Sequence, residues 1–206
     1  MIINPVLYIA FALVFGLFAL IHSLTAANWF RGKASVVMGD RYTHYRILYN
    51  VASVITFVPV FLIWARYSAY APVIYIAPQF LHLPLYAVQV ISLGAAVLTF
   101  LKFDFLEFIG LKTGASQEGQ KLVTAGLYGI VRHPMYLFII IFLWTKPAFN
   151  SLYLLAAALF TAYFVVGAFL EEKKLIKEFG AEYRRYQEAV PMFLPQPFFS
   201  LRSKKR

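Results

Sequence analysis

Residues 151–170 read SLYLLAAALFTAYFVVGAFL and contain no charged side chain. Twenty residues in an α-helix span about 30 Å, which is the thickness of the hydrocarbon core of a bilayer. Three more stretches are apolar and long enough to cross as helices, at Pro5–Ala27, Ile47–Ala65 and Leu85–Phe103. A shorter apolar stretch, Tyr136–Ala148, precedes the quoted one. The sequence therefore predicts an all-α integral membrane protein with five transmembrane helices.

The composition of the 206-residue chain excludes several other classes of protein. Hydrophobic residues make up 61% of the chain and charged residues only 14%. With a mean hydropathy of +0.69, the chain is too apolar for a soluble, disordered or collagen-like protein. It has no cysteine, which excludes a disulfide framework, a thiolate metal site and a cysteine nucleophile. Its four histidines show no metal-ligand spacing, so no metal site is predicted.

The fourth and fifth spans are predicted to form a helical hairpin. Lys146 and Pro147, followed by Asn150, mark a turn between the two spans. Residues 1–110 are then expected to carry the three N-terminal spans. Residues 111–206 are expected to carry the hairpin, a polar cytoplasmic region and a basic tail.

The distribution of Lys and Arg predicts the orientation in the membrane. With five spans, seventeen of the nineteen basic residues fall on the side of the C-terminus, and only Arg66 and Lys146 fall on the other. Basic loops stay in the cytoplasm, so the N-terminus is expected outside and the C-terminus inside. This topology accounts for the net charge of +10 without a nucleic-acid partner. The segment Ser68–Pro84 contains three prolines and is expected to be an irregular outer loop.

The first polar stretch, residues 118–136, reads EGQKLVTAGLYGIVRHPMY. Proline is favoured in the first turn of a helix, so Pro134 is expected to begin the fourth span. Unpaired backbone N–H groups would then face the cytoplasmic interface beside Arg132 and His133. Such a helix start attracts a carboxylate or a phosphate.

The second polar stretch begins with Glu171 and Glu172, which follow the fifth span without a polar spacer. A carboxylate at the hydrocarbon boundary is costly unless it is paired. The hairpin would bring these glutamates close to His133, and a pocket that combines both features suits a zwitterion. The alternatives are a simple helix start, glutamates solvated beside lysines, and an arginine that reaches lipid phosphates.

Other polar residues inside or near the spans have simpler interpretations. His22 and Gln89 are expected to be hydrogen-bond partners between helices. Asp104 and Glu107, three residues apart at the end of the third span, would share a helix face. They are expected to be solvated at the interface, and the alternative is that they line an acceptor site.

Several of these residues form an ordered pattern that resembles a known family. The run LVTAGLYGIVRHPMY is followed by EE and then by FGAEYRRYQEAVPMFLP, over about Gln120 to Pro195. This order resembles the isoprenylcysteine carboxyl methyltransferase family, a group of membrane methyltransferases that also includes phospholipid methyltransferases. The resemblance implies that S-adenosylmethionine binds at the cytoplasmic face, leaving S-adenosylhomocysteine as product, and that a lipophilic acceptor comes from the bilayer.

The family pattern implies that residues 111–206 are the cofactor-binding and catalytic region, and it implies a set of site residues. Those expected to bind the cofactor are Gln120, Lys121, Leu122, Val123, Tyr128, His133, Pro134, Met135, Tyr136 and Glu171. Those expected to act in catalysis are Arg132, His133, Glu171 and Glu172. His133 and neighbouring N–H groups would hold the cofactor's carboxylate, and Glu171 would accept from its ribose or its ammonium.

Two positions depart from the family pattern. Gln120 stands where related enzymes carry a histidine. Gly167 stands where prenylcysteine-methylating members carry an arginine that is thought to meet the acceptor's carboxylate. Methyl transfer is therefore a firmer expectation than a prenylcysteine acceptor.

The expected reaction is isoprenylcysteine-like carboxyl methylation, because a carboxylate is already ionised and needs no base. The alternatives are a phospholipid N-methyltransferase or a thiol methyltransferase of the same fold. A non-enzymatic membrane scaffold or a transporter is the rival from another class. Transporters usually show internal repeats and polar residues at mid-span, and neither is evident in this sequence.

Overall fold

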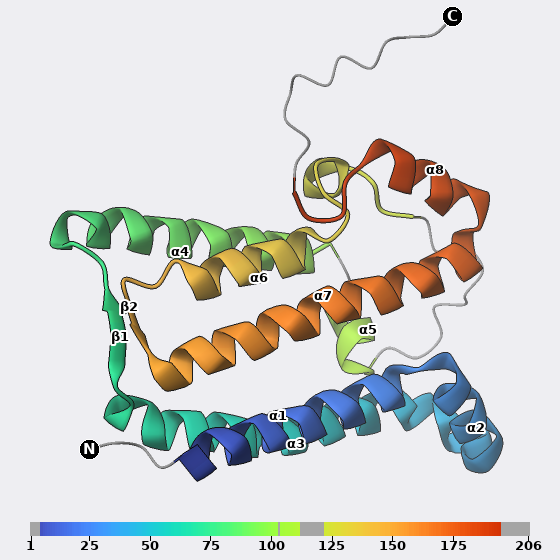
Figure 1. Ribbon diagram of the computed structural model, residues 1–206. Helices are drawn as coiled ribbons and strands as arrows, with labels where there is room; N and C mark the ends of the chain where they lie inside the picture. The colour runs from blue at the N-terminus through green and yellow to red at the C-terminus, as the bar shows by residue number, and fades with distance from the viewer. Residues whose placement is uncertain (1–4, 103, 112–121, 195–206) are drawn as a thin grey trace, which may run out of the picture.

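The computed structural model describes residues 5–102, 104–111 and 122–194 of the chain. Figure 1 shows their arrangement as a bundle of helices with a short two-stranded ribbon at one end. In chain order the elements are α1 (Pro5–Ala26), α2 (Asn28–Met38), η1 (Gly39–His44), α3 (Tyr45–Tyr67), η2 (Ser68–Tyr70), β1 (Val73–Ile76), α4 (Gln79–Phe100), α5 (Phe105–Ile109), η3 (Gly126–Gly129), α6 (Pro134–Trp144), β2 (Ala148–Asn150), α7 (Ser151–Phe179) and α8 (Ala181–Ala189).

Four of these helices, α1, α3, α4 and α7, are long and apolar enough to cross a membrane. The predicted helical membrane protein is confirmed to this extent. Helix α6 has 11 residues and spans about 16 Å, which is half of a hydrocarbon core. The count of five spans therefore stays a prediction.

Helix α7 lies between two pairs of helices, α4 with α6 on one side and α1 with α3 on the other (Figure 1). Three phenylalanines of α1, Phe11, Phe15 and Phe18, are buried against Val60 of α3 and Leu152 of α7. Many large apolar side chains elsewhere on the helices are exposed. This inside-out distribution fits a bundle whose outer surface contacts lipid.

The third span differs from its predicted bounds of Leu85–Phe103. Helix α4 begins six residues earlier, at Gln79, and ends at Phe100. The prediction treated Pro84 as a loop signal, but the helix continues through it. A proline inside a helix removes one backbone hydrogen bond, and membrane helices tolerate this where neighbouring groups satisfy the freed carbonyl.

The predicted irregular outer loop is partly ordered, and the fold is not purely α-helical. Strand β1 pairs antiparallel with β2 from the hairpin connection. The Ala77 N–H donates to the Pro147 carbonyl at 2.7 Å, and the Ser151 N–H donates to the Pro72 carbonyl at 2.9 Å. The ribbon thus satisfies backbone groups that an irregular connection near the membrane would leave without partners.

Both predicted interhelical hydrogen bonds are present. The Gln89 side-chain amide of α4 donates to the Phe142 carbonyl of α6 at 3.0 Å. The ring nitrogens of His22 lie 2.9 Å from the Ser53 hydroxyl and 2.7 Å from the Tyr49 hydroxyl, both on α3. The first contact joins α4 to α6, and the other two join α1 to α3.

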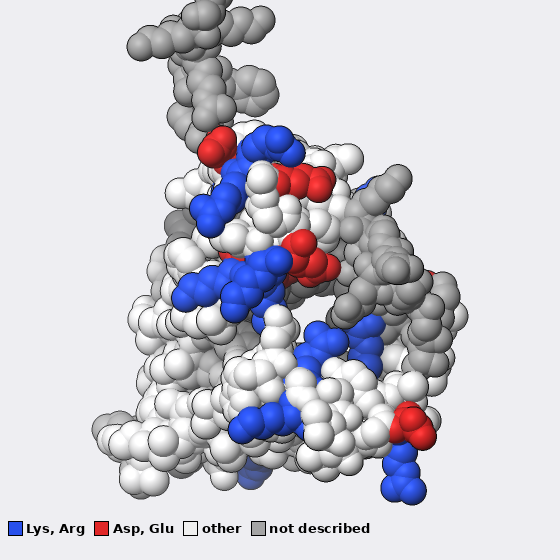
Figure 2. All heavy atoms as spheres, turned by 90° about the vertical axis from the view of Figure 1, so that its right-hand side faces the viewer, with Lys and Arg blue, Asp and Glu red and all other residues white. Residues whose placement is uncertain are grey.

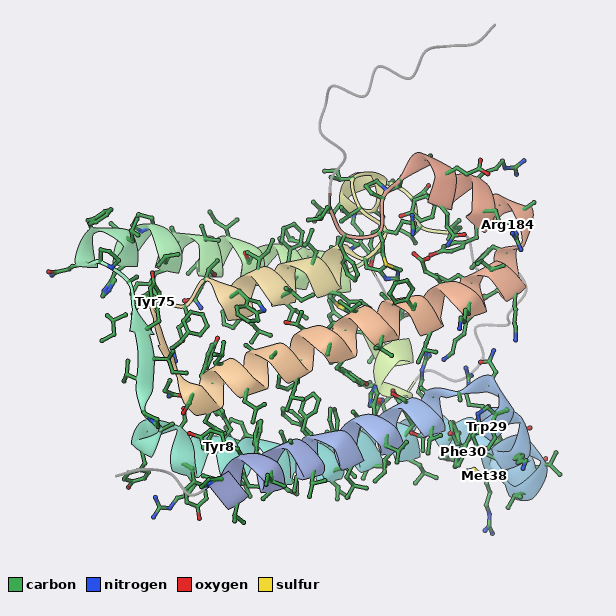
Figure 3. All side chains as sticks on the ribbon, in the orientation of Figure 1. Tyr8, Trp29, Phe30, Met38, Tyr75 and Arg184 are labelled. Atoms are coloured by element: carbon green, nitrogen blue, oxygen red, sulfur yellow. The ribbon has the colours of Figure 1, made fainter. Side chains whose placement is uncertain are left out.

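The start of α7 is fastened by several polar contacts. Figure 3 shows Tyr8 of α1 near this point, where its hydroxyl contacts the Ser151 hydroxyl. The Asn150 side chain caps α7 by accepting from the Tyr153 N–H at 2.7 Å. Its amide nitrogen also donates to the Ser68 carbonyl and hydroxyl, at 2.9 and 3.0 Å. One asparagine thus joins the hairpin to the end of α3.

We predict that Asn150→Ala lowers the free energy of unfolding by about 1 to 3 kcal/mol, because it removes a helix cap and two further hydrogen bonds. Denaturant unfolding of the micelle-solubilised protein would measure the change. Asn28→Ala is the matched control, since Asn28 is exposed at the first residue of α2. Equal stability losses in the two variants would contradict this account of the cap.

Candidate active site

The end of the bundle opposite the ribbon gathers α2, α5, α8 and residues 122–133 (Figure 1). Helix α6 begins there at Pro134, with His133 as its N-cap residue, as predicted. Two nearby N–H groups are not free, however. The Arg132 N–H donates to the Pro191 carbonyl at 2.9 Å, and the His133 N–H donates to the Met192 carbonyl at 3.2 Å. These two N–H groups therefore do not belong to the open helix start, because the chain after α8 returns to pair with them, and the prediction of an anion site rests on the first-turn N–H groups that follow Pro134.

Arg132 and Glu172 form a buried ion pair. The Arg132 Nε atom lies 2.7 Å from a Glu172 oxygen, and the two side chains are 10% and 9% exposed. Arg132 Nη1 also donates to the carbonyls of Gln187 and Val190, where α8 ends. The Gln187 amide donates to the second Glu172 oxygen at 2.7 Å. Glu172 is therefore neither solvated beside lysines nor open to a ligand, and its carboxylate holds α8 against α7.

His133 lies between two carboxylates. Its Nε2 atom is 3.2 Å from Glu172, and its Nδ1 atom is 3.6 Å from Glu171. A carboxylate only accepts, so the Nε2 atom of His133 donates to Glu172. The His133 ring stacks on Tyr136, with 5.6 Å between the ring centroids, and the Tyr136 hydroxyl donates to Glu171 at 3.0 Å.

A cavity of about 370 Å³ lies beside these residues. The predicted site residues that line it are Leu122, Val123, Tyr128, Arg132, His133, Pro134, Met135, Tyr136 and Glu171. Glu172 is not among the lining residues, and both of its carboxylate oxygens already accept hydrogen bonds from Arg132, His133 and Gln187. Gln120 and Lys121 lie outside the described residues. One cavity thus brings together nearly all of the predicted positions that the structure describes.

Further residues line the cavity that were absent from the predicted cofactor and catalytic set. They are Lys102, Asp104, Leu175, Glu178, Phe179, Tyr183 and Tyr186. Asp104 was a candidate for an acceptor site, but it precedes α5 and accepts from the Leu106 N–H at 3.0 Å instead of sharing a face of the third span. The side chain of Glu107 lies outside the described part.

The two tyrosines of α8 could have been found from their spacing. Tyr183 and Tyr186 are three residues apart and share one helix face, which is buried, while the neighbouring Arg184 is exposed and lies on the outer side of α8 (Figure 3). Gly180, with φ of +55°, ends α7 and allows α8 to turn back over the site. The tyrosines therefore face the cavity from α8.

The phenols around the cavity stay protonated at neutral pH. Burial and the nearby Glu171 carboxylate raise the pKa of Tyr128 to about 12. Burial, partly offset by Arg132, raises the pKa of Tyr186 to about 12. The Tyr186 hydroxyl donates to the Tyr128 carbonyl at 2.6 Å. Each phenol thus acts as a neutral hydrogen-bonding group.

Figure 2 shows the end of the molecule on which this site lies. Lys and Arg side chains gather around a hollow on this face, with fewer Asp and Glu side chains among them. A basic rim of this kind attracts anionic molecules and lipid headgroups.

We predict that Glu172→Ala lowers the free energy of unfolding by about 3 to 5 kcal/mol, since it leaves the buried Arg132 without its partner charge. Glu182→Ala removes an exposed carboxylate from the first turn of α8 and should cost less than about 1 kcal/mol. Unfolding in the same micelles would compare the two variants. A small loss for both would show that the ion pair does not hold the site together.

Comparisons with known proteins bear on the function of this site. Residues 84–182 match the model of a family described as phospholipid methyltransferase. Methanethiol S-methyltransferase 2 of Bradyrhizobium diazoefficiens is 38% identical over 109 residues, which is 50% of this chain and 42% of that protein. No solved structure matches the chain.

Two further relatives carry a similar name. The methanethiol S-methyltransferase of Pseudomonas deceptionensis is 45% identical over 69 residues, covering 34% of this chain and 26% of the relative. That of Mycobacterium tuberculosis is 38% identical over 71 residues, covering 34% and 29%. The alignments thus span less than half the length of each relative. Over residues 84–182 the chain is related to the phospholipid methyltransferase family, and the predicted resemblance to membrane methyltransferases is confirmed.

Proposed function

We propose that this protein is an integral membrane methyltransferase that transfers a methyl group from S-adenosylmethionine to the sulfur of a small, lipophilic thiol. The observation that carries the proposal is the shared name of the relatives, which are methanethiol S-methyltransferases. The family match at residues 84–182 covers most of the residues that line the cavity. The alternative of a thiol acceptor thus has better support than the isoprenylcysteine carboxylate first expected.

The surroundings of Gly167 agree with a thiol acceptor. A Cβ atom added at Gly167 would meet no other atom within 4 Å, so the absence of a longer side chain is not imposed by crowding. A carboxylate acceptor needs a positive partner when it leaves water, and glycine supplies none. A thiol leaves water as a neutral molecule, so it needs no such partner to enter the site.

The cavity has groups that fit S-adenosylmethionine. Its volume lies at the lower end of the range of about 300 to 1,000 Å³ that is common for ligand sites. The Glu171 carboxylate is an acceptor, suited to an ammonium or to ribose hydroxyls. The N–H groups of Met135 and Tyr136 lie in the first turn of α6, where a carboxylate is favoured. Apolar walls from Leu175 and its neighbours would pack against the adenine.

The proposed reaction is a direct displacement. The bound cofactor supplies a methyl group on a positively charged sulfur. A thiolate sulfur attacks this methyl carbon, a new carbon–sulfur bond forms as the old one breaks, and the products are a thioether and S-adenosylhomocysteine. The thiol proton is lost to solvent before transfer, because the thiolate and not the thiol is the nucleophile. The role of the chain is to align the two sulfur atoms and exclude water.

A second cavity offers a place for the apolar part of the acceptor. It has a volume of about 260 Å³ and lies between α4, α6 and α7. Its lining residues are Leu93, Ala96, Ile139, Phe142, Leu143, Phe160 and Phe164. Phe164 stacks on Tyr136, with 5.4 Å between centroids, and Tyr136 lines the polar cavity. The acceptor would approach through the bilayer and the cofactor from water, and the two would meet near this ring pair.

The orientation in the membrane is part of the proposal. The site lies at the end of the bundle that carries the basic face, and this end is expected in the cytoplasm, where S-adenosylmethionine is made available. The N-terminus would then lie outside.

We predict that a reporter enzyme active only in the cytoplasm is active when fused after Arg206. The same reporter inserted at the outer ribbon, after Tyr75, is expected to be inactive, because seventeen of the nineteen basic residues lie on the other side. Activity of only the second fusion would invert the topology and the proposed route of the cofactor.

We predict that purified protein in lipid vesicles, given S-adenosylmethionine, methylates ethanethiol, butanethiol and hexanethiol to the corresponding thioethers. The rate at low thiol concentration should rise with chain length, because each methylene adds about 0.8 kcal/mol to partitioning into the bilayer. Mass spectrometry of the thioether and of S-adenosylhomocysteine would measure the reaction. Turnover of phosphatidylethanolamine or of a prenylcysteine, with no thioether formed, would replace the thiol by that acceptor.

A further inference from the structure

Tyr183 carries a polar atom that the fold does not use. Its side chain is among the largest fully buried ones and the residue is 1% exposed. In the part of the chain that the structure describes, its hydroxyl has no hydrogen-bond partner. A buried hydroxyl without a partner costs about 1 to 3 kcal/mol, so such atoms are rare in folded proteins. Tyr183 lines the polar cavity beside Glu171 and His133.

Contacts of α8 with neighbouring segments hold the Tyr183 ring in place. Helix α8 is held by Arg132, which donates to the carbonyls of Gln187 and Val190. The ring packs edge to face on Tyr186, with 5.8 Å between centroids, and the Tyr186 hydroxyl is bonded to the Tyr128 carbonyl. Among the described residues, the Tyr186 hydroxyl therefore has a hydrogen-bond partner, whereas the Tyr183 hydroxyl on the same face of α8 has none.

The Tyr183 hydroxyl is a neutral group that can donate and accept. Burial and the carboxylate of Glu172 raise the pKa of Tyr183, and Arg132 opposes them only in part. The hydroxyl therefore keeps its proton at physiological pH and can donate to an oxygen of a ligand. Sulfur is a weak hydrogen-bonding atom, so a small thiol is a poor partner for it. Hydroxyl and carboxylate oxygens are good partners.

We infer that Tyr183 is a binding residue for the methyl donor, and that its hydroxyl donates a hydrogen bond to an oxygen of the ribose or of the carboxylate of S-adenosylmethionine. This inference rests on the proposed function and adds a residue to its site. The fold tolerates the unpaired hydroxyl because the cost is recovered when the ligand supplies the partner. In the ligand-free protein the unpaired hydroxyl therefore lowers the stability.

The test is Tyr183→Phe, which removes only the hydroxyl. Calorimetry with S-adenosylhomocysteine should show affinity lowered by about 5- to 100-fold, the usual effect of losing one hydrogen bond from a binding site. The thermal midpoint of the ligand-free variant should be unchanged or higher, because no hydrogen bond of the free protein is lost. A purely structural role of the hydroxyl would instead lower this midpoint.

Tyr153→Phe is the matched control. Tyr153 is also buried, but it lies at the start of α7, at the end of this helix that is remote from the polar cavity. Its hydroxyl donates to the Leu143 carbonyl at 2.8 Å. This variant should lose stability and keep its affinity for S-adenosylhomocysteine, the reverse of the pattern for Tyr183→Phe.

The outcomes separate the two proposals. If the wild-type protein binds S-adenosylhomocysteine and Tyr183→Phe binds it equally well, the role of Tyr183 is overturned and the proposed function stands. If the wild-type protein does not bind it, both are overturned. Lower affinity with an unchanged or higher midpoint supports the inference.

Discussion

The buried ion pair between Arg132 and Glu172 is the contact on which the candidate site depends. It joins the loop before α6 to the C-terminal part of α7, and the remaining guanidinium and carboxylate positions hold the end of α8. Two charges this far from water are stable only when each has its partners. Because these partners come from three separate segments, the pair fixes the relative positions of His133, Glu171 and the tyrosines of α8. The cavity is the space that this arrangement encloses.

The candidate site lies at the end of the apolar run of α7. Helix α7 extends about 30 Å from Ser151 to Leu170, and Glu171 follows at the point where the apolar run stops. One cavity is lined by carboxylates, phenols and a histidine among other residues, and the second cavity is lined only by apolar residues. Tyr136 lines the first cavity and Phe164 lines the second, and their rings stack on each other. This placement suits a reaction between a water-soluble donor and an acceptor that dissolves in the bilayer.

The nature of the acceptor illustrates the limit of a family pattern. The residues that resemble the isoprenylcysteine methyltransferases lie mainly around the polar cavity, so the pattern describes the donor half of the site. Gly167, which departs from it, lies one helical turn before Glu171 on α7. The carboxylate acceptor was favoured on the ground that it needs no base, whereas the names of the relatives favour a thiol. The absence of the family's arginine at Gly167 agrees with the names of the relatives, whereas the argument that a carboxylate needs no base does not.

Local sequence patterns determined the long apolar helices, the start of α6 at Pro134, the hairpin and most of the cavity lining, because hydrophobic length and proline position act within a few residues of the chain. Only the tertiary structure decided which glutamate faces the cavity. Glu171 and Glu172 are adjacent, and the rotation of α7 against α6 and α8 directs one to the cavity and the other to Arg132. The β1–β2 ribbon, the return of Pro191 and Met192 to the N–H groups before α6, and the unpaired hydroxyl of Tyr183 likewise depend on contacts between distant segments. No spacing along the chain encodes those contacts.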